Sequence, residues 1–132
     1  MIKPETSDKM RFLMRLNAEI GTARRADVKG YYIGGKTGTA EKVIGGRYSK
    51  TKLLTTFMAV LPADKPRYLI TLLLDEPKGL PETHGFATSG WNAAPTAAKI
   101  IARVAPMLGL EPRLDLPPAD QLILANARQA AR

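Results

Sequence analysis

Residues 53–74 read LLTTFMAVLPADKPRYLITLLL, and this stretch sets the architecture of the chain. Two nearly continuous apolar runs, 53–61 and 68–74, are separated only by a short, proline-containing link at 62–67. So short a link permits an antiparallel hairpin, whereas a parallel crossover needs about a dozen residues or more. Near-continuous apolar character is typical of strands that are covered on both faces. The stretch therefore predicts a buried antiparallel pair of strands.

The flanking segments predict a third strand and two helices. Residues 31–43 are rich in aromatic residues, threonine and glycine and predict a strand, which a Gly-Gly pair at 45–46 ends; 47–52 then reads as a polar loop. Apolar residues at helical spacing predict one helix over 4–20 and another over 95–108. The expected fold class is α+β, a three-stranded antiparallel sheet flanked by N- and C-terminal helices.

The composition restricts the chemistry that is available. The chain has 132 residues, of which 45% are hydrophobic and 24% charged, as in an ordinary globular domain. The absence of cysteine excludes disulfides, thiolate metal sites and cysteine nucleophiles. His84 is the only histidine, so sites that need two imidazoles are excluded as well. We expect no metal and no cofactor, and any chemistry must use Lys, Ser, Thr, Tyr or carboxylate groups.

The net charge of +8 raises the question of an anionic partner. The basic residues are scattered along the chain, and their densest cluster, at 42–52, contains a single aromatic residue, Tyr48. This distribution favours a solvated basic surface over a nucleic-acid site, although a basic nucleic-acid-binding module remains an alternative. No apolar run is long enough to span a membrane, and no charged-then-apolar leader follows Met1, so we expect no targeting signal on this chain.

Residues 30–37 read GYYIGGKT and satisfy the phosphate-loop pattern G-x-x-x-x-G-K-[ST]. A phosphate loop requires a helix that begins at the Lys-Thr pair and points its N–H groups at the anion. Here Gly38, Thr39 and Ala40 follow Thr37, which is a poor start for a helix. The hairpin at 53–74 also requires antiparallel strands, whereas that fold needs parallel ones. A P-loop-type nucleotide-binding protein therefore remains only an alternative.

A second pattern, S-x-x-K, occurs at Ser49 to Lys52. In serine acyl-transfer enzymes this pair places a serine at a buried helix start, with the lysine one turn later as a base. The segment 47–52 instead reads as a polar loop after two glycines, so we interpret this match as a coincidence.

The third motif lies on the predicted strand, where residues 34–41 read GGKTGTAE. K-T-G alone is a weak signal, but here it stands on a strand and an antiparallel hairpin follows it. This stretch resembles the third signature of the transpeptidase domain of class B penicillin-binding proteins, the division-specific peptidoglycan D,D-transpeptidases in particular. The resemblance covers about residues 2–110, and it includes residues 4–6, 21–22 and 26–31, both apolar strands and the Ala94-Pro95 start of the last helix.

The resemblance implies an incomplete serine β-lactamase/transpeptidase-like fold and a role for each residue of the motif. Lys36 would be a cation that lines the cleft and tunes the surroundings of the nucleophile. The hydroxyls of Thr37 and Thr39 would hold the carboxylate of a stem peptide or a penicillin, and the backbone N–H of Thr39 would form half of an oxyanion hole. Gly38 would let the substrate backbone approach the strand edge closely.

The same family needs a nucleophilic S-x-x-K and an S-x-N motif, and neither Ser7 nor Ser89 provides one. We therefore expect residues 1–108 to be the C-terminal portion of a transpeptidase domain, inactive on its own, with 109–132 as a Pro/Ala-rich tail. The resemblance implies peptidoglycan stem peptide or β-lactam as ligands of the parent protein, at the periplasmic face of the bacterial inner membrane, and no nucleic acid. A sheet severed from its neighbouring strands should also self-associate through an exposed edge.

Other residues in the loop 75–90 and just after it suggest no catalytic role. Phe86 and Trp91 are interpreted as packing residues, and His84, in a stretch rich in Gly and Pro, as an exposed bystander. Asp75 and Glu76 follow a predicted strand, and we expect them to be solvated or paired with Lys78.

Overall fold

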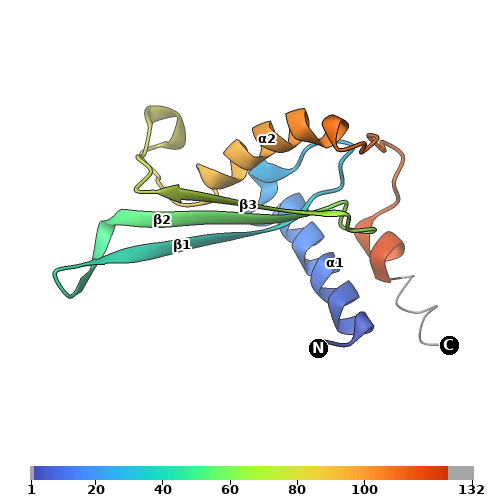
Figure 1. Ribbon diagram of the computed structural model, residues 1–132, viewed down its shortest axis with the longest axis horizontal. Coiled ribbons are helices and arrows are strands. Elements are labelled where there is room, and N and C mark those ends of the chain that lie inside the picture. Colours follow the sequence, from blue (N-terminus) through green and yellow to red (C-terminus); the bar gives the residue numbers. More distant parts are fainter. Residues whose placement is uncertain (1, 125–132) are drawn as a thin grey trace.

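A three-stranded antiparallel sheet, in the order β1-β2-β3, carries the two long helices on opposite sides. Figure 1 shows α2 lying along one face, α1 crossing the start of β1 from the other side, and the β1-β2 hairpin projecting beyond both helices. The computed structural model describes residues 2–124. The elements are α1 (Pro4–Ile20), η1 (Arg24–Ala26), β1 (Gly34–Ile44), β2 (Arg47–Leu61), β3 (Tyr68–Asp75), η2 (Pro81–Thr83), α2 (Ala93–Met107) and η3 (Asp120–Leu124). The predicted α+β class, with its antiparallel sheet and two flanking helices, is confirmed.

Both long helices have recognisable ends. Pro4 lies in the first turn of α1, where its missing N–H costs nothing, and Gly21 closes the helix with an N–H that donates to the carbonyl of Asn17 at 3.0 Å. Helix α2 starts at Ala93, slightly earlier than predicted, because the side chain of Asn92 accepts a hydrogen bond from the backbone N–H of that residue.

The segment 47–52 is part of β2, so its prediction as a polar loop was wrong. Gly45 and Gly46 have φ angles of 57° and 80° and form the hairpin turn itself, and Ile44 pairs directly with Arg47. A two-residue turn with positive φ continues the ladder on both sides, whatever the polarity of the side chains. The pairing register shifts once, between Glu41 and Lys42.

The core lies between the sheet and α2. Phe57, Ala59 and Leu61 of β2 are fully buried, together with Ala97 and Ile101 of α2. Side chains of β3 alternate, so that every second one packs against this core.

The other face of the sheet is largely open, which corrects the expectation that both apolar strands are covered on both faces. Met58, Leu69 and Leu73 on this face are 44%, 60% and 55% exposed. The long helix α1 covers only the start of β1, so most of this face has no helix across it. The run of leucines in β3 predicted that both faces of this strand are buried, but the structure buries only one of them.

The segment that follows α2 packs back onto the rest of the molecule. Leu110, Ala119 and Ile123 are buried, and the guanidinium of Arg113 forms two hydrogen bonds, of 2.6 and 2.9 Å, with the Asp64 carboxylate. The predicted Pro/Ala-rich tail 109–132 is therefore packed against the rest of the molecule as far as Ile123, and residues 125–132 lie outside the described range. Within the described residues, no helix has the length and apolar character to cross a membrane.

Candidate functional site

Strand β1 is an edge of the sheet, and some of its backbone groups point away from β2. The side-chain amide of Asn17 donates to the carbonyl of Gly35 at 2.8 Å, and the ammonium group of Lys36 donates to the carbonyl of Thr37 at 2.6 Å. Both carbonyls therefore face outward. Because direction alternates along an antiparallel strand, the N–H and C=O of Thr39 face outward too. The edge can thus pair with an extended chain.

The hydroxyls of Thr37 and Thr39 lie on the face of the sheet that carries α2. The Thr37 hydroxyl is 2.8 Å from that of Thr22, and the Thr39 hydroxyl accepts a 3.0 Å hydrogen bond from the backbone N–H of Ser89. A hydroxyl has one proton to donate and can accept as well. The proton of Thr39 therefore stays available. The Thr22 hydroxyl donates to the side-chain oxygen of Asn17 at 3.2 Å, so Thr37 is the donor in its contact with Thr22. Thr39 can donate to an anion directly, and Thr37 can do so once its hydroxyl rotates away from Thr22.

These hydroxyls open into a hollow of about 530 Å³ between β1, the end of α1 and the loop before α2. The hollow is lined by Ile20, Gly21, Thr22, Arg24, Arg25, Thr37, Thr39, Thr88, Gly90 and Trp91. Its lining contains two arginines and four threonines and no carboxylate, so its electrostatic character suits an anion. Among the described residues, no three His, Asp or Glu side chains gather closely enough to hold a metal ion.

A polar network fixes the loop that closes this hollow. The buried Ser89 hydroxyl donates to the carbonyl of Thr56 at 2.5 Å, and the Thr55 hydroxyl donates to the side-chain oxygen of Asn92 at 3.0 Å. The amide of Asn92 in turn donates to the carbonyl of Ala87 at 2.6 Å. Buried polar groups that are all satisfied hold a loop in one conformation. The donors around Thr39 are therefore positioned before any ligand arrives.

Lys36 and Gly38 lie on the opposite face from the two threonines, since neighbouring residues of a strand point to opposite sides. Lys36 is exposed, and its ammonium group turns back to the strand edge rather than into the hollow. A methyl group at Gly38 would lie 2.5 Å from the hydroxyl of Thr56. A side chain at this position therefore fits only if the Thr56 hydroxyl rotates away. The structure brings Thr37 and Thr39 together in one hollow and leaves Lys36 beside it.

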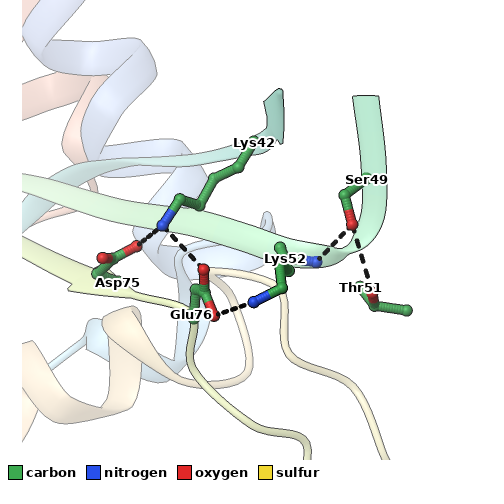
Figure 2. Close-up of polar contacts among 6 residues, drawn as sticks. All are labelled: Lys42, Ser49, Thr51, Lys52, Asp75 and Glu76. Atoms are coloured by element: carbon green, nitrogen blue, oxygen red, sulfur yellow. Dashed lines mark hydrogen bonds and ion pairs between the residues drawn. The ribbon is translucent and has the colours of Figure 1, made fainter. Parts of the chain in front are cut away.

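Ser49 lies in β2 near the hairpin turn, not at the start of a helix (Figure 2). Its hydroxyl accepts a 3.3 Å bond from the backbone N–H of Lys52 and lies 3.4 Å from the Thr51 hydroxyl. The Lys52 ammonium points elsewhere and pairs with Glu76 at 2.9 Å. The only side-chain group in hydrogen-bonding contact with the Ser49 hydroxyl among the described residues is that of Thr51, which is not a base, and this supports the interpretation of the S-x-x-K match as a coincidence.

Glu76 bridges two lysines at the far end of the sheet (Figure 2). Hydrogen bonds from Lys42 and Lys52 lower the pKa of its carboxyl to about 2, and Lys42 also pairs with Asp75 at 2.9 Å. These acids were expected to be solvated or paired with Lys78: the Asp75 side chain is 63% exposed, but the lysines that pair with the two acids are Lys42 and Lys52. The cross-strand ion pairs tie β3 to both strands of the hairpin, so this cluster has a structural explanation.

The phosphate-loop alternative fails on geometry. Thr37 lies in the middle of β1, which pairs antiparallel with β2, and no helix starts there. Trp91 stacks on Phe86 at 5.5 Å between ring centroids. Phe86 is nevertheless 52% exposed and Trp91 lines the hollow, so neither is a core packing residue as predicted. His84 is exposed, and its ring meets the edge of Trp91.

Two residues of the hollow and one residue of the loop that closes it were not identified as site residues from the sequence. Thr22 was noticed only as part of a Gly-Thr pair, Arg25 was assigned to a polar connection, and Ser89 was considered only as a failed nucleophile. Ser89 lies 50 positions from its partner Thr39, and no local spacing predicts such a contact. Only the fold brings these side chains to the strand edge.

Residues 1–102 match the family model described as the penicillin binding protein transpeptidase domain. The chain belongs to this family. It is 42% identical over 125 residues to the probable peptidoglycan D,D-transpeptidase FtsI of Caulobacter vibrioides, covering 88% of this chain and 21% of that protein. It is 37% identical over 113 residues to stage V sporulation protein D of Bacillus subtilis, covering 86% and 17%.

Solved structures of the family have the same fold. The transpeptidase domain of Burkholderia pseudomallei penicillin-binding protein 3 matches with a TM-score of 0.72 at 29% identity, over 88% of this chain and 33% of that one. Penicillin-binding protein 3 of Mycobacterium tuberculosis, complexed with ampicillin, matches with a TM-score of 0.67 at 28% identity, over 89% and 26%. The transpeptidase fragment described here thus spans about a fifth of the length of these two curated relatives.

Proposed function

We propose that residues 34–41 are the substrate-binding strand of a peptidoglycan D,D-transpeptidase. The observation that carries this proposal is the outward-facing backbone of β1 beside the hydroxyl groups of Thr37 and Thr39. An extended peptide adds to such an edge as a further strand, which aligns it along β1. Its terminal carboxylate then accepts hydrogen bonds from Thr37 and Thr39, which are strong because the acceptor is charged.

The backbone N–H of Thr39 is suited to the reaction itself. In serine acyl transfer the serine oxygen attacks a peptide carbonyl carbon, and negative charge develops on the carbonyl oxygen until the terminal residue leaves. An N–H already aimed outward stabilises that oxyanion without reorganisation. The attacking serine must come from outside these 132 residues, because Ser49 has no base. Lys36, at the strand edge, would then add positive charge beside the reacting groups.

The ligand and the location follow from the family. One relative of known structure is complexed with ampicillin, and another relative is named as a peptidoglycan D,D-transpeptidase. We assign peptidoglycan stem peptide and β-lactams as the ligands of the parent protein, and the periplasmic face of the inner membrane as its location. The parent's membrane anchor would lie outside this chain. Nothing in the anion-binding hollow calls for nucleic acid.

Peptide binding can be tested directly on this chain. N-acetyl-D-alanyl-D-alanine, a peptide with one carboxylate, is titrated into isotopically labelled protein and followed by NMR. We expect amide shifts concentrated at residues 37–39. The double variant Thr37→Val/Thr39→Val should bind at least tenfold more weakly, because two charge-assisted hydrogen bonds are worth about 1.5 kcal/mol or more each. Thr71→Val, on the open face of the sheet, is the matched control. Shifts that lie elsewhere, or that survive the double variant, would contradict the proposal.

We also propose that the isolated chain self-associates through the outer edge of β3. Leu69, Thr71 and Leu73 present outward backbone groups and exposed side chains there, and such an edge recruits another strand. Sedimentation velocity should show a larger species that grows with concentration. Thr71→Pro removes an outward N–H and should yield a monomer, whereas Thr71→Val should not. A wild-type chain that stays monomeric at high concentration would refute this proposal.

A further inference from the structure

The side chain of Asn17, in the last turn of α1, joins that helix to the edge of β1. Its amide nitrogen donates to the carbonyl of Gly35 at 2.8 Å, and its oxygen accepts from the backbone N–H of Thr22 at 3.0 Å. A backbone carbonyl can only accept and a backbone N–H can only donate, so these two partners fix the orientation of the amide. The oxygen of Asn17 is therefore held at the end of α1 as an acceptor.

This fixed oxygen sets the direction of two hydroxyl groups. The Thr22 hydroxyl lies 3.2 Å from the Asn17 oxygen and must donate to it, because an amide oxygen has no proton to give. The Thr22 oxygen in turn accepts the proton of Thr37 at 2.8 Å. The hydrogen bonds thus run in one direction, from Thr37 through Thr22 to Asn17. Both hydroxyl protons are engaged within the protein, whereas the proton of Thr39 is not.

We propose that Thr22 and Asn17 are positioning residues that restrain the Thr37 hydroxyl and so lower the affinity of the hollow for a carboxylate. This inference rests on the proposed function, in which the peptide carboxylate accepts from Thr37 and Thr39. To receive a proton from Thr37, the carboxylate must break a hydrogen bond that the protein makes at rest. A charged acceptor offsets that loss, since its hydrogen bonds are about twice as strong as neutral ones. The carboxylate therefore binds, but more weakly than it would bind to two unrestrained hydroxyls.

The variant Thr22→Val tests the restraint, because it removes the acceptor of the Thr37 proton and nearly keeps the shape of the side chain. We expect N-acetyl-D-alanyl-D-alanine to bind this variant about fivefold more tightly than wild type, which corresponds to about 1 kcal/mol, the net value of a typical hydrogen bond. NMR titration of the full chain measures the affinity. Thr22→Ser keeps the hydroxyl and should restore the wild-type affinity. A merely structural role of Thr22 predicts the opposite sign, since a loosened end of α1 would weaken binding.

Double variants show whether the effect passes through Thr37. In a Thr37→Val background, Thr22→Val should no longer change the affinity, because the proton that it releases is absent. Asn17→Leu removes the oxygen that orients Thr22, so it should tighten binding in the wild-type background but not in Thr22→Val. Thermal unfolding checks that each variant is folded at the temperature of the titration. If Asn17→Leu does not fold, the cycle of Thr22 with Thr37 decides alone.

The outcomes separate this inference from the proposed function. If Thr22→Val binds the peptide no more tightly than wild type, while Thr37→Val/Thr39→Val loses binding, the restraint is refuted and the proposed function stands. The same conclusion follows if the tighter binding persists in the Thr37→Val background. If wild type does not bind the peptide, or if binding ignores Thr37→Val/Thr39→Val, the proposed function fails and this inference fails with it. Tighter binding in Thr22→Val that requires Thr37 supports the inference.

Discussion

Replacing Arg113 with alanine is expected to lower the free energy of unfolding by about 3 kcal/mol, at the lower end of the range for breaking a buried ion pair. The Asp64 side chain is only 2% exposed, and Arg113 is its ion-pair partner. Without the guanidinium, a buried carboxylate loses both charge-assisted hydrogen bonds. The Arg113 side chain is 35% exposed, so water replaces part of the loss, which is why we expect the lower figure. Urea unfolding followed by circular dichroism measures the change.

The pH dependence identifies the cause of this loss. Burial of the Asp64 carboxyl by itself raises its pKa, but the hydrogen bonds and charge of Arg113 outweigh burial, so the pKa lies below its ordinary value. A lowered pKa gives stability that is complete above about pH 4 and is lost as the pH falls through the folded-state value. In Arg113→Ala burial prevails and the sign reverses, so the deficit should shrink from pH 7 to pH 3. Asp64→Asn in the same background should recover part of the stability. An equal deficit at both pH values would contradict this account.

Gly35→Ala should be nearly as disruptive, with a loss of about 3 kcal/mol, the upper end for overpacking a core. A methyl group at Gly35 would collide with the ring of Phe57, which is fully buried. The ring cannot move aside without disturbing the α2 interface. For a domain of this size, the melting temperature should fall by roughly 10 °C. Thermal unfolding followed by calorimetry measures the shift.

Two further variants test whether the ring is responsible. Gly38→Ala collides only with the Thr56 hydroxyl, which can rotate, so its cost should stay within about 1 kcal/mol. Phe57→Leu in the Gly35→Ala background makes room for the methyl group, and the double variant should be more stable than the sum of the single losses predicts. Strict additivity of the two substitutions would show that the collision is not the cause.

Local rules predicted most of the fold. The short link at 62–67 required an antiparallel pair, and the periodicity of 4–20 gave the first helix, because both signals act over a few residues. The predictions were wrong where the polarity of the side chains was used to infer backbone conformation or burial. Residues 47–52 are polar but form a strand, since two glycines at the turn continue the ladder. The leucines of 68–74 suggested that both faces of this strand are buried. Whether a face is buried depends on which segments, distant in the sequence, pack against it.

Only the part of the site that lies in the K-T-G-T motif could be predicted from the sequence. Thr37 and Thr39 were identified because K-T-G-T carries a sequence signal, and the structure does place their hydroxyls in one hollow. Thr22 and Ser89 contact these threonines across 15 and 50 positions of chain, and Arg25 lines the same hollow; no pattern in the sequence specifies this arrangement. The tertiary structure alone shows which donors line the same hollow.

The loop before α2 touches the sheet edge through Thr39, and this contact has a consequence for the whole domain. The Thr39 oxygen accepts from Ser89 while its proton remains to be given away, and Asn92, three residues after Ser89, caps α2. Donating that proton makes the oxygen a better acceptor, because successive hydrogen bonds polarise one another. Under the proposed function, a peptide that accepts this proton would therefore strengthen the hydrogen bond between Thr39 and the loop, and through the loop stabilise the first turn of α2. Peptide binding and the anchoring of α2 would then be coupled through the Thr39 hydroxyl.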